Sequence, residues 1–143
     1  MPNGVPFYFS YLYENKHTMI ITQTLRLPTL EIVKGNTYFE TYTITDDDDN
    51  PVDLSGYDLI KMDIRTGLTA NTKLLHSSSL ENGEITVSGD FNEIITFKID
   101  PAITKEWNAG TYHRDVFFVD DVAEMSTTLL KGKIIVINNI TSI

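Results

Sequence analysis

The sequence has 143 residues, the size of one domain, and a chain of this length buries roughly two thirds of its unfolded surface on folding. It contains no cysteine, which excludes disulfides, thiolate metal sites and cysteine nucleophiles. A formal net charge of -9 argues against sequence-independent nucleic-acid binding, which requires a basic face. The apolar runs at residues 116–119 and 134–137 are far shorter than the roughly 20 residues of a membrane helix. We therefore expect a soluble chain with neither nucleic acid nor membrane as a partner.

The N-terminal 18 residues are rich in aromatic side chains but have neither the basic start nor the small-residue cleavage site of a signal peptide. Two interpretations remain open: an arm that docks on a partner subunit, or an extension upstream of a second possible start at Met19. Aromatic enrichment at interface cores favours the arm. We predict an extended arm and first strand over residues 1–28 and a sandwich domain over residues 29–143. The predicted partner-interface residues are Phe7, Tyr8, Phe9, Tyr11 and Tyr13.

Two strands around an acidic turn are predicted over residues 35–67. Residues 37–44 alternate with the period of two that is typical of a half-buried strand. Residues 46–51 then carry four Asp, an Asn and a Pro, which favour a turn. Val52 and Leu54 return the chain to the core, and residues 57–65 form the second strand.

The acidic turn partly imitates a calcium loop. Asp46, Asp48 and Asn50 fall at the first three ligand positions, but Pro51 replaces the required Gly and Tyr57 replaces the bidentate Glu. This pattern excludes an EF-hand. A solvated turn is the favoured interpretation, and a weak surface calcium site over residues 46–49 is the alternative.

The following segment continues as strands. Residues 73–79 and 84–87 flank an Asn-Gly pair that supplies the positive φ of a tight hairpin, and residues 94–99 form the next strand. A single helical turn is predicted at residues 102–107, with Asp100 as its N-cap and Pro101 in its first turn. Trp107 is expected to pack over the edge of the core.

The C-terminal third contains a candidate tyrosine corner. Gly110 and Tyr112 fit the pattern in which a Tyr hydroxyl turns back to bond upstream backbone, and Arg114 stands where antibody domains have a Cys. Strands are predicted at residues 111–119, 124–130 and 133–138. The predicted fold is thus all-β, an immunoglobulin-like antiparallel β-sandwich with one short helical turn and an extended N-terminal arm.

No pattern of catalytic residues emerges from the sequence. His113, Arg114 and Asp115 spell the kinase catalytic tripeptide, but the Gly-rich loop and the other kinase motifs are missing. The three histidines lack metal-ligand spacing, and the acidic pairs cluster in turns, where charge is common. We therefore expect no enzyme activity, no cofactor and no metal.

The order of these motifs resembles a family of phage proteins. The carriers are the Gly-polar-Thr start at residue 35, the acidic turn ending in Asn-Pro, Val-Asp-Leu-Ser-Gly-Tyr at residues 52–57, the tyrosine corner, and the ending at residues 129–141. Together they resemble the immunoglobulin-like β-sandwich structural proteins of tailed phages, notably the N-terminal domain of upper-baseplate proteins. The resemblance covers about residues 33–141.

The resemblance implies a non-enzymatic virion component in a symmetric tail, baseplate or fibre-attachment assembly, oligomeric and in contact with other virion proteins and copies of itself. A capsid decoration or head-fibre anchoring protein is an alternative. Because these relatives usually continue into a receptor-facing part and this sequence does not, an adaptor role is expected. A carbohydrate-binding module is a further alternative, with stacking platforms at Tyr8, Tyr11, Tyr13 or Tyr38.

Overall fold

A computed structural model describes residues 4–6, 9–13, 18–21, 25–46, 48–120 and 125–139, with side chains described for residues 26–46, 48–120 and 130–139. The secondary-structure elements, in chain order, are β1 (Gly4–Pro6), β2 (Phe9–Tyr13), β3 (Thr18–Ile21), β4 (Leu25–Arg26), β5 (Leu30–Val33), β6 (Tyr38–Thr45), β7 (Leu59–Arg65), β8 (Leu74–Ser79), β9 (Ile85–Ser88), β10 (Ile94–Ile99), α1 (Pro101–Thr104), β11 (Gly110–Asp120) and β12 (Met125–Ile137).

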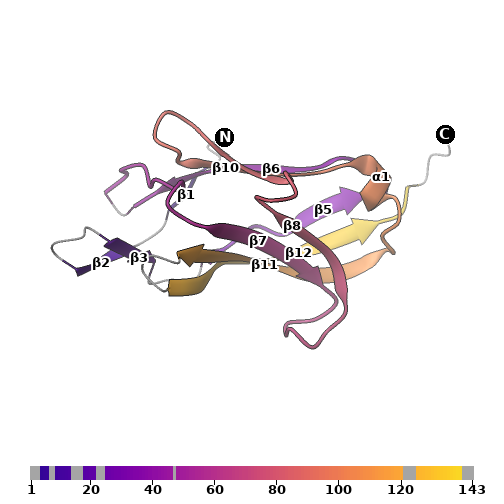
Figure 1. The fold of residues 1–143 in the computed structure, drawn as a ribbon. Coiled ribbons are helices and arrows are strands. Elements are labelled where there is room, and N and C mark those ends of the chain that lie inside the picture. The colour runs from indigo at the N-terminus through magenta and orange to yellow at the C-terminus, as the bar shows by residue number, and fades with distance from the viewer. Residues whose placement is uncertain are drawn as a thin grey trace.

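The strands form two facing sheets, which confirms the predicted all-β sandwich (Figure 1). One sheet has the order β1-β6-β10-β9, and the other has the order β4-β12-β11-β7-β8 with β5 also paired to β12. The long neighbours are antiparallel, as predicted, whereas β1 runs parallel to β6, and β4 and β5 run parallel to β12. The sandwich is therefore mixed at its edges, where the N-terminal segments add to it.

The core lies between these sheets and follows the period-two alternation of the strands. On β7, Ile60, Met62 and Ile64 are fully buried while the residues between them are half-buried. Phe97, on β10 of the facing sheet, and Phe118, on the neighbouring strand β11 of the same sheet, belong to the same buried cluster. Each such side chain contributes about 1.5–3 kcal/mol by leaving water, so alternation in the sequence is enough to fix which face of each strand points inward.

The N-terminal residues are more structured than the extended arm we predicted. β1 pairs with β6 through Gly4 to Thr43, Val5 to Ile44 and Pro6 to Thr45, so it lengthens the sandwich's own sheet. β2 and β3 pair with each other in a separate two-stranded sheet beyond one end of the sandwich (Figure 1). The segment therefore forms an edge strand and a hairpin.

Two local predictions were wrong. Lys131 and Gly132 do not separate two strands, because β12 runs unbroken over residues 125–137 and stays paired with β11 on one side and with β4 and β5 on the other. The helix ends at Thr104, earlier than predicted, and Asp100 occupies the N-cap position without a side-chain cap bond. None of the helical structure in the described residues is long and apolar enough to cross a membrane.

Trp107 and Tyr112 close the end of the sandwich near α1. Trp107 is 3 % exposed and lies edge-on to Tyr38, with ring centroids 6.3 Å apart. The Tyr112 hydroxyl donates a 2.7 Å hydrogen bond to the carbonyl oxygen of Asn108, which is the backbone contact of a tyrosine corner.

Replacing Tyr112 by Phe should lower the free energy of unfolding by about 1 kcal/mol, because the Asn108 carbonyl loses its donor while the ring stays packed. Denaturant unfolding of both proteins measures the difference. Equal midpoints would show that the corner contributes nothing to stability.

Candidate interaction surface

The structure places only part of the predicted aromatic interface. Phe7 and Tyr8 lie outside the described residues. Phe9, Tyr11 and Tyr13 lie in β2, where their backbone pairs with β3, and their side chains are outside what is described. Their role at an interface therefore stays a prediction. Tyr38, the remaining candidate for stacking a sugar, is fully buried beneath Trp107, so that prediction was wrong.

The acidic turn, residues 46–50, is held by one of its own carboxylates, and Asp47 within it lies outside the described residues. The Oδ1 atom of Asp46 accepts hydrogen bonds from the backbone N–H groups of Asp48 and Asn50, both at 2.9 Å. Asp49 has a φ of 63°, a conformation that Asp tolerates better than most residues. Asp48 and Asp49 are exposed. The turn thus presents carboxylates to solvent on a fixed backbone.

Replacing Asp46 by Ala should lower the free energy of unfolding by about 1 kcal/mol, because two backbone N–H groups lose their acceptor. The exposed Asp48 provides a matched control, and Asp48→Asn should stay within about 0.5 kcal/mol. Thermal unfolding with and without calcium separates the two interpretations of this turn. A solvated turn predicts no change in Tm, and a rise in Tm with calcium would support the weak metal site.

A groove of about 930 Å³ lies on the outward face of the six-stranded sheet. Its floor is made by the residues that alternate with the buried ones on three adjacent strands: Lys61, Asp63 and Arg65 on β7, His113, Asp115 and Phe117 on β11, and Lys131 and Lys133 on β12. The inward neighbours of these residues fill the core, so the sheet's pleat holds the floor residues facing solvent. We call this surface the sheet groove.

The floor of the sheet groove is organised in rows across the sheet. Lys131 lies opposite Asp115, Asp115 lies opposite Asp63, and Asp63 lies opposite Ser77 of β8. The carboxylate of Asp63 accepts from Arg65 at 3.2 Å and from Ser77 at 2.8 Å, and the ammonium group of Lys61 is 3.8 Å away. Burial raises the pKa of Asp115, against the lowering effect of the Lys131 charge. Both acids are thus flanked by cations.

The loop between β7 and β8, residues 66–73, projects away from the sandwich (Figure 1), and its residues 67–70 line one wall of the sheet groove. Its ends are tied by a 2.9 Å bond from the Thr66 N–H to the Lys73 carbonyl, and Arg65 donates to the Thr72 carbonyl at 2.8 Å. Leu68 stands on this wall with 77 % of its surface exposed, and Phe117 adds a second exposed apolar side chain on the floor. The groove therefore combines charge with apolar surface, as interface cores do.

A buried ion pair lies directly beneath the groove. The Arg114 guanidinium faces inward and donates to the Glu40 carboxylate, to the Tyr38 hydroxyl at 2.7 Å and to the Pro28 carbonyl at 2.9 Å. Glu40 also accepts from Tyr38 and from Tyr42. Because Arg114 is on β11 and Glu40 is on β6, the cluster joins the two sheets across the core.

Gly132 leaves room for this cluster at the base of the groove. A Cβ added at Gly132 would lie 3.1 Å from the Leu27 carbonyl oxygen and 3.2 Å from Nε of Arg114. The Gly in the middle of β12 is thus explained by close approach of backbone and guanidinium rather than by a break in the strand.

The groove has a signal in the sequence that lies in the charged residues and not in the apolar ones. Charged residues at alternate positions, Lys61-x-Asp63-x-Arg65 and Lys131-x-Lys133, mark outward faces of strands in the same way that apolar residues mark inward faces. The pairing of those strands could not be obtained from spacing alone. No group of three or more His, Asp or Glu side chains is arranged as metal ligands in the part of the chain that the structure describes.

The fold and this surface together define an all-β sandwich with a charged, hollowed sheet face. No protein-family model matches the sequence. No curated protein matches it either. Among solved structures, the chain is similar to the N-terminal domain of phage TP901-1 ORF48, at 9 % identity and a TM-score of 0.46, with 93 % of this chain and 97 % of that chain covered.

Proposed function

We propose that this protein is a non-enzymatic structural component of a tailed-phage virion, which packs into a symmetric tail, baseplate or fibre-attachment assembly. The observation that carries the proposal is the order of sequence motifs that resembles the phage family, now placed on a sandwich. The acidic turn follows β6, residues 52–57 lead into β7 with Val52 and Leu54 buried, and the tyrosine corner opens β11. These three motifs follow one another along the sandwich in the order of the resemblance, whereas Gly132, expected just before the last strand, lies inside β12.

Two surfaces support a role in packing against neighbours. The hairpin β2–β3 lies beyond the end of the sandwich and contains three of the five aromatic residues assigned to an interface. The sheet groove offers a second, charged surface on the outward face of the larger sheet. A capsid decoration or head-fibre anchoring protein would use the same surfaces and is the second candidate. The carbohydrate-binding alternative loses Tyr38, which is buried.

The protein composition of purified particles tests this proposal. Mass spectrometry of gradient-purified virions should find the chain at a fixed copy number relative to known structural proteins. A chain that stays in the lysate and is absent from intact particles would contradict a virion role.

Replacing the five aromatic residues Phe7, Tyr8, Phe9, Tyr11 and Tyr13 by Ser should reduce incorporation into particles while the sandwich stays folded. This change keeps β1, whose deletion would uncover the edge of β6. The matched control replaces Phe39 and Phe91, which are exposed on the sandwich itself, by Ser. Wild-type copy number in particles carrying the five-Ser variant would show that the aromatic segment is no docking element.

A further inference from the structure

We propose that the sheet groove of one copy binds the acidic turn of a second copy, so that neighbouring subunits are joined turn-into-groove. The inference rests on the proposed function for its setting, a symmetric assembly, and it names one contact within that assembly. The contact itself is a property of the purified chain.

The charge of the groove carries the first step. The chain has 11 Lys and Arg residues and a net charge of -9. Five of these cations line the groove, apart from the buried Arg114. They are Arg26, Lys61, Arg65, Lys131 and Lys133. Two carboxylates, Asp63 and Asp115, share the lining, so its formal charge is +3 when the buried pair of Arg114 and Glu40 is left out. A positive groove on an acidic protein attracts an acidic partner.

The cations on the β12 side of the groove are available to such a partner. Within the described residues, no carboxylate lies within 4.0 Å of the side-chain nitrogens of Arg26, Lys131 or Lys133, and all three residues are exposed. Arg26 and Lys131 lie opposite each other on β4 and β12. Like charges placed side by side repel, and a carboxylate between them would relieve that repulsion.

The acidic turn has the matching chemistry. Residues 46–49 are four consecutive Asp in the sequence, and of the described ones Asp48 and Asp49 are exposed, where the N–H groups of Asp48 and Asn50 bond the Asp46 carboxylate. A turn held in one conformation loses little entropy on binding. The groove volume of about 930 Å³ lies within the size range of sites that enclose small ligands, which is about 300–1,000 Å³.

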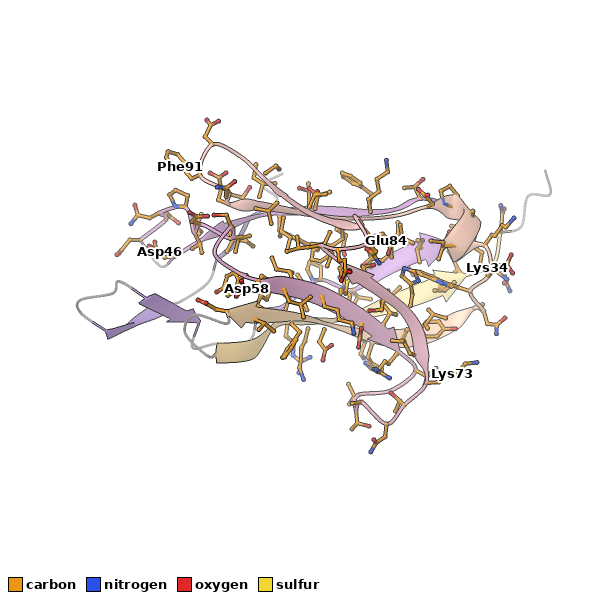
Figure 2. All side chains as sticks on the ribbon, viewed as in Figure 1. Lys34, Asp46, Asp58, Lys73, Glu84 and Phe91 are labelled. Atoms are coloured by element: carbon orange, nitrogen blue, oxygen red, sulfur yellow. The ribbon has the colours of Figure 1, made fainter. Side chains whose placement is uncertain are left out.

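The geometry makes the contact intermolecular. Asp46 follows β6 in the smaller sheet, and the groove lies on the face of the larger sheet that points away from the smaller one. Figure 2 shows Asp46 at one end of the sandwich and Lys73, on the loop that borders the groove, near the other. The turn therefore cannot reach the groove of its own chain. Because turn and groove are different surfaces of one chain, two copies can exchange them reciprocally in a two-fold dimer, or successive copies can repeat the contact in a ring or filament.

A charge-exchange experiment tests the contact directly. The groove variant carries Arg26→Glu and Lys133→Glu, which leaves Asp115 facing its Lys131 neighbour. The turn variant carries Asp47→Lys and Asp48→Lys, which keeps the Asp46 acceptor and the positive φ at Asp49.

Sedimentation velocity of the full chain should show self-association that each variant alone weakens by about tenfold or more. Mixing the two variants should restore association, because the unaltered turn of the groove variant meets the unaltered groove of the turn variant and the acidic groove meets the basic turn.

Matched controls make the same changes in net charge elsewhere on exposed positions. Lys98→Glu with Lys105→Glu should leave association unchanged, and so should Glu81→Lys with Asp90→Lys. Raising the salt from about 50 mM to about 500 mM should weaken the wild-type contact, since screening shortens the reach of charges. Circular dichroism and the denaturation midpoint verify that every variant is folded.

A monomeric wild-type chain at all concentrations would overturn the proposal. So would self-association that both variants retain, or a mixture of the two variants that fails to recover. The proposal would also be wrong if the groove bound a different acidic partner while the chain itself did not self-associate. Failure of the proposed function looks different: the chain would be absent from particles while the charge exchange between purified chains still succeeds.

Discussion

Replacing Arg114 by Met is expected to lower the free energy of unfolding by about 3–5 kcal/mol, the range for breaking a buried ion pair by removing one partner. Glu40 would be left charged and 8 % exposed, with only the hydroxyls of Tyr38 and Tyr42 as donors, and the Pro28 carbonyl would lose its bond. Urea unfolding monitored through Trp107 fluorescence measures the loss. A typical domain has a total stability of about 5–15 kcal/mol, so this loss is a large share of the free energy that keeps the protein folded.

A double variant separates the cost of an unpaired charge from the cost of lost packing. Arg114→Met combined with Glu40→Leu removes both charges, and it should recover much of the stability lost by Arg114→Met alone. If the single and double variants both lower the free energy of unfolding by the same small amount, the ion pair contributes little to holding β6 against β11.

Raising the pH from 10 to 12 is expected to destabilise the protein, because Tyr38 is fully buried and Tyr42 and Tyr57 are partly buried in their neutral forms. Burial, and then the negative charge of Asp120, raises the pKa of Tyr57 to about 12. Burial and the Glu40 carboxylate raise the pKa of Tyr38 and of Tyr42, against the opposing charge of Arg114. The unfolded chain releases these protons near the ordinary pKa of about 10.

The direction of this effect follows from proton binding. Above pH 10 the folded state holds protons that the unfolded state has released, so the free energy of unfolding falls as the pH rises. Below pH 10 both states are protonated and these groups leave stability unchanged. Urea midpoints from pH 8 to 12 measure the loss, and Tyr57→Phe should make the slope shallower. A flat profile across this range would show that the phenols are not buried as described.

Alternation in the sequence predicted most strands because burial of one face decides their orientation. Residues 94–99 and 57–65 were assigned from their apolar periods, and β10 (Ile94–Ile99) and β7 (Leu59–Arg65) lie within two residues of them. The break expected at Gly132 did not occur, because a Gly in a strand also serves close approach, and only the tertiary neighbours Leu27 and Arg114 distinguish the two uses. β1 pairs in parallel with β6, and β5 pairs in parallel with β12. Both pairings depend on contacts between different segments of the chain, which the period of a single strand does not encode.

The interaction surface was less accessible to sequence reasoning than the fold. The sequence drew attention to Arg114 as a departure from antibody domains and as part of a chance kinase-like tripeptide, but not as an ion-pair residue, because its partner Glu40 lies 74 residues away on the opposite sheet. The groove likewise needs β7, β11 and β12 side by side before its cations converge. The acidic turn was predicted from composition, yet the role of Asp46 in holding the turn depends on backbone geometry that the four consecutive Asp residues do not specify.

The position of this chain in the assembled particle tests the central claim most directly. A cryo-EM reconstruction of virions should contain the sandwich in symmetry-related copies, with residues 1–18 of each copy within about 4.5 Å of a neighbouring chain. The claim of a structural virion component is contradicted if particles of full infectivity contain no density for the sandwich. Density in which residues 1–18 touch only their own sandwich would contradict the docking role of the aromatic segment.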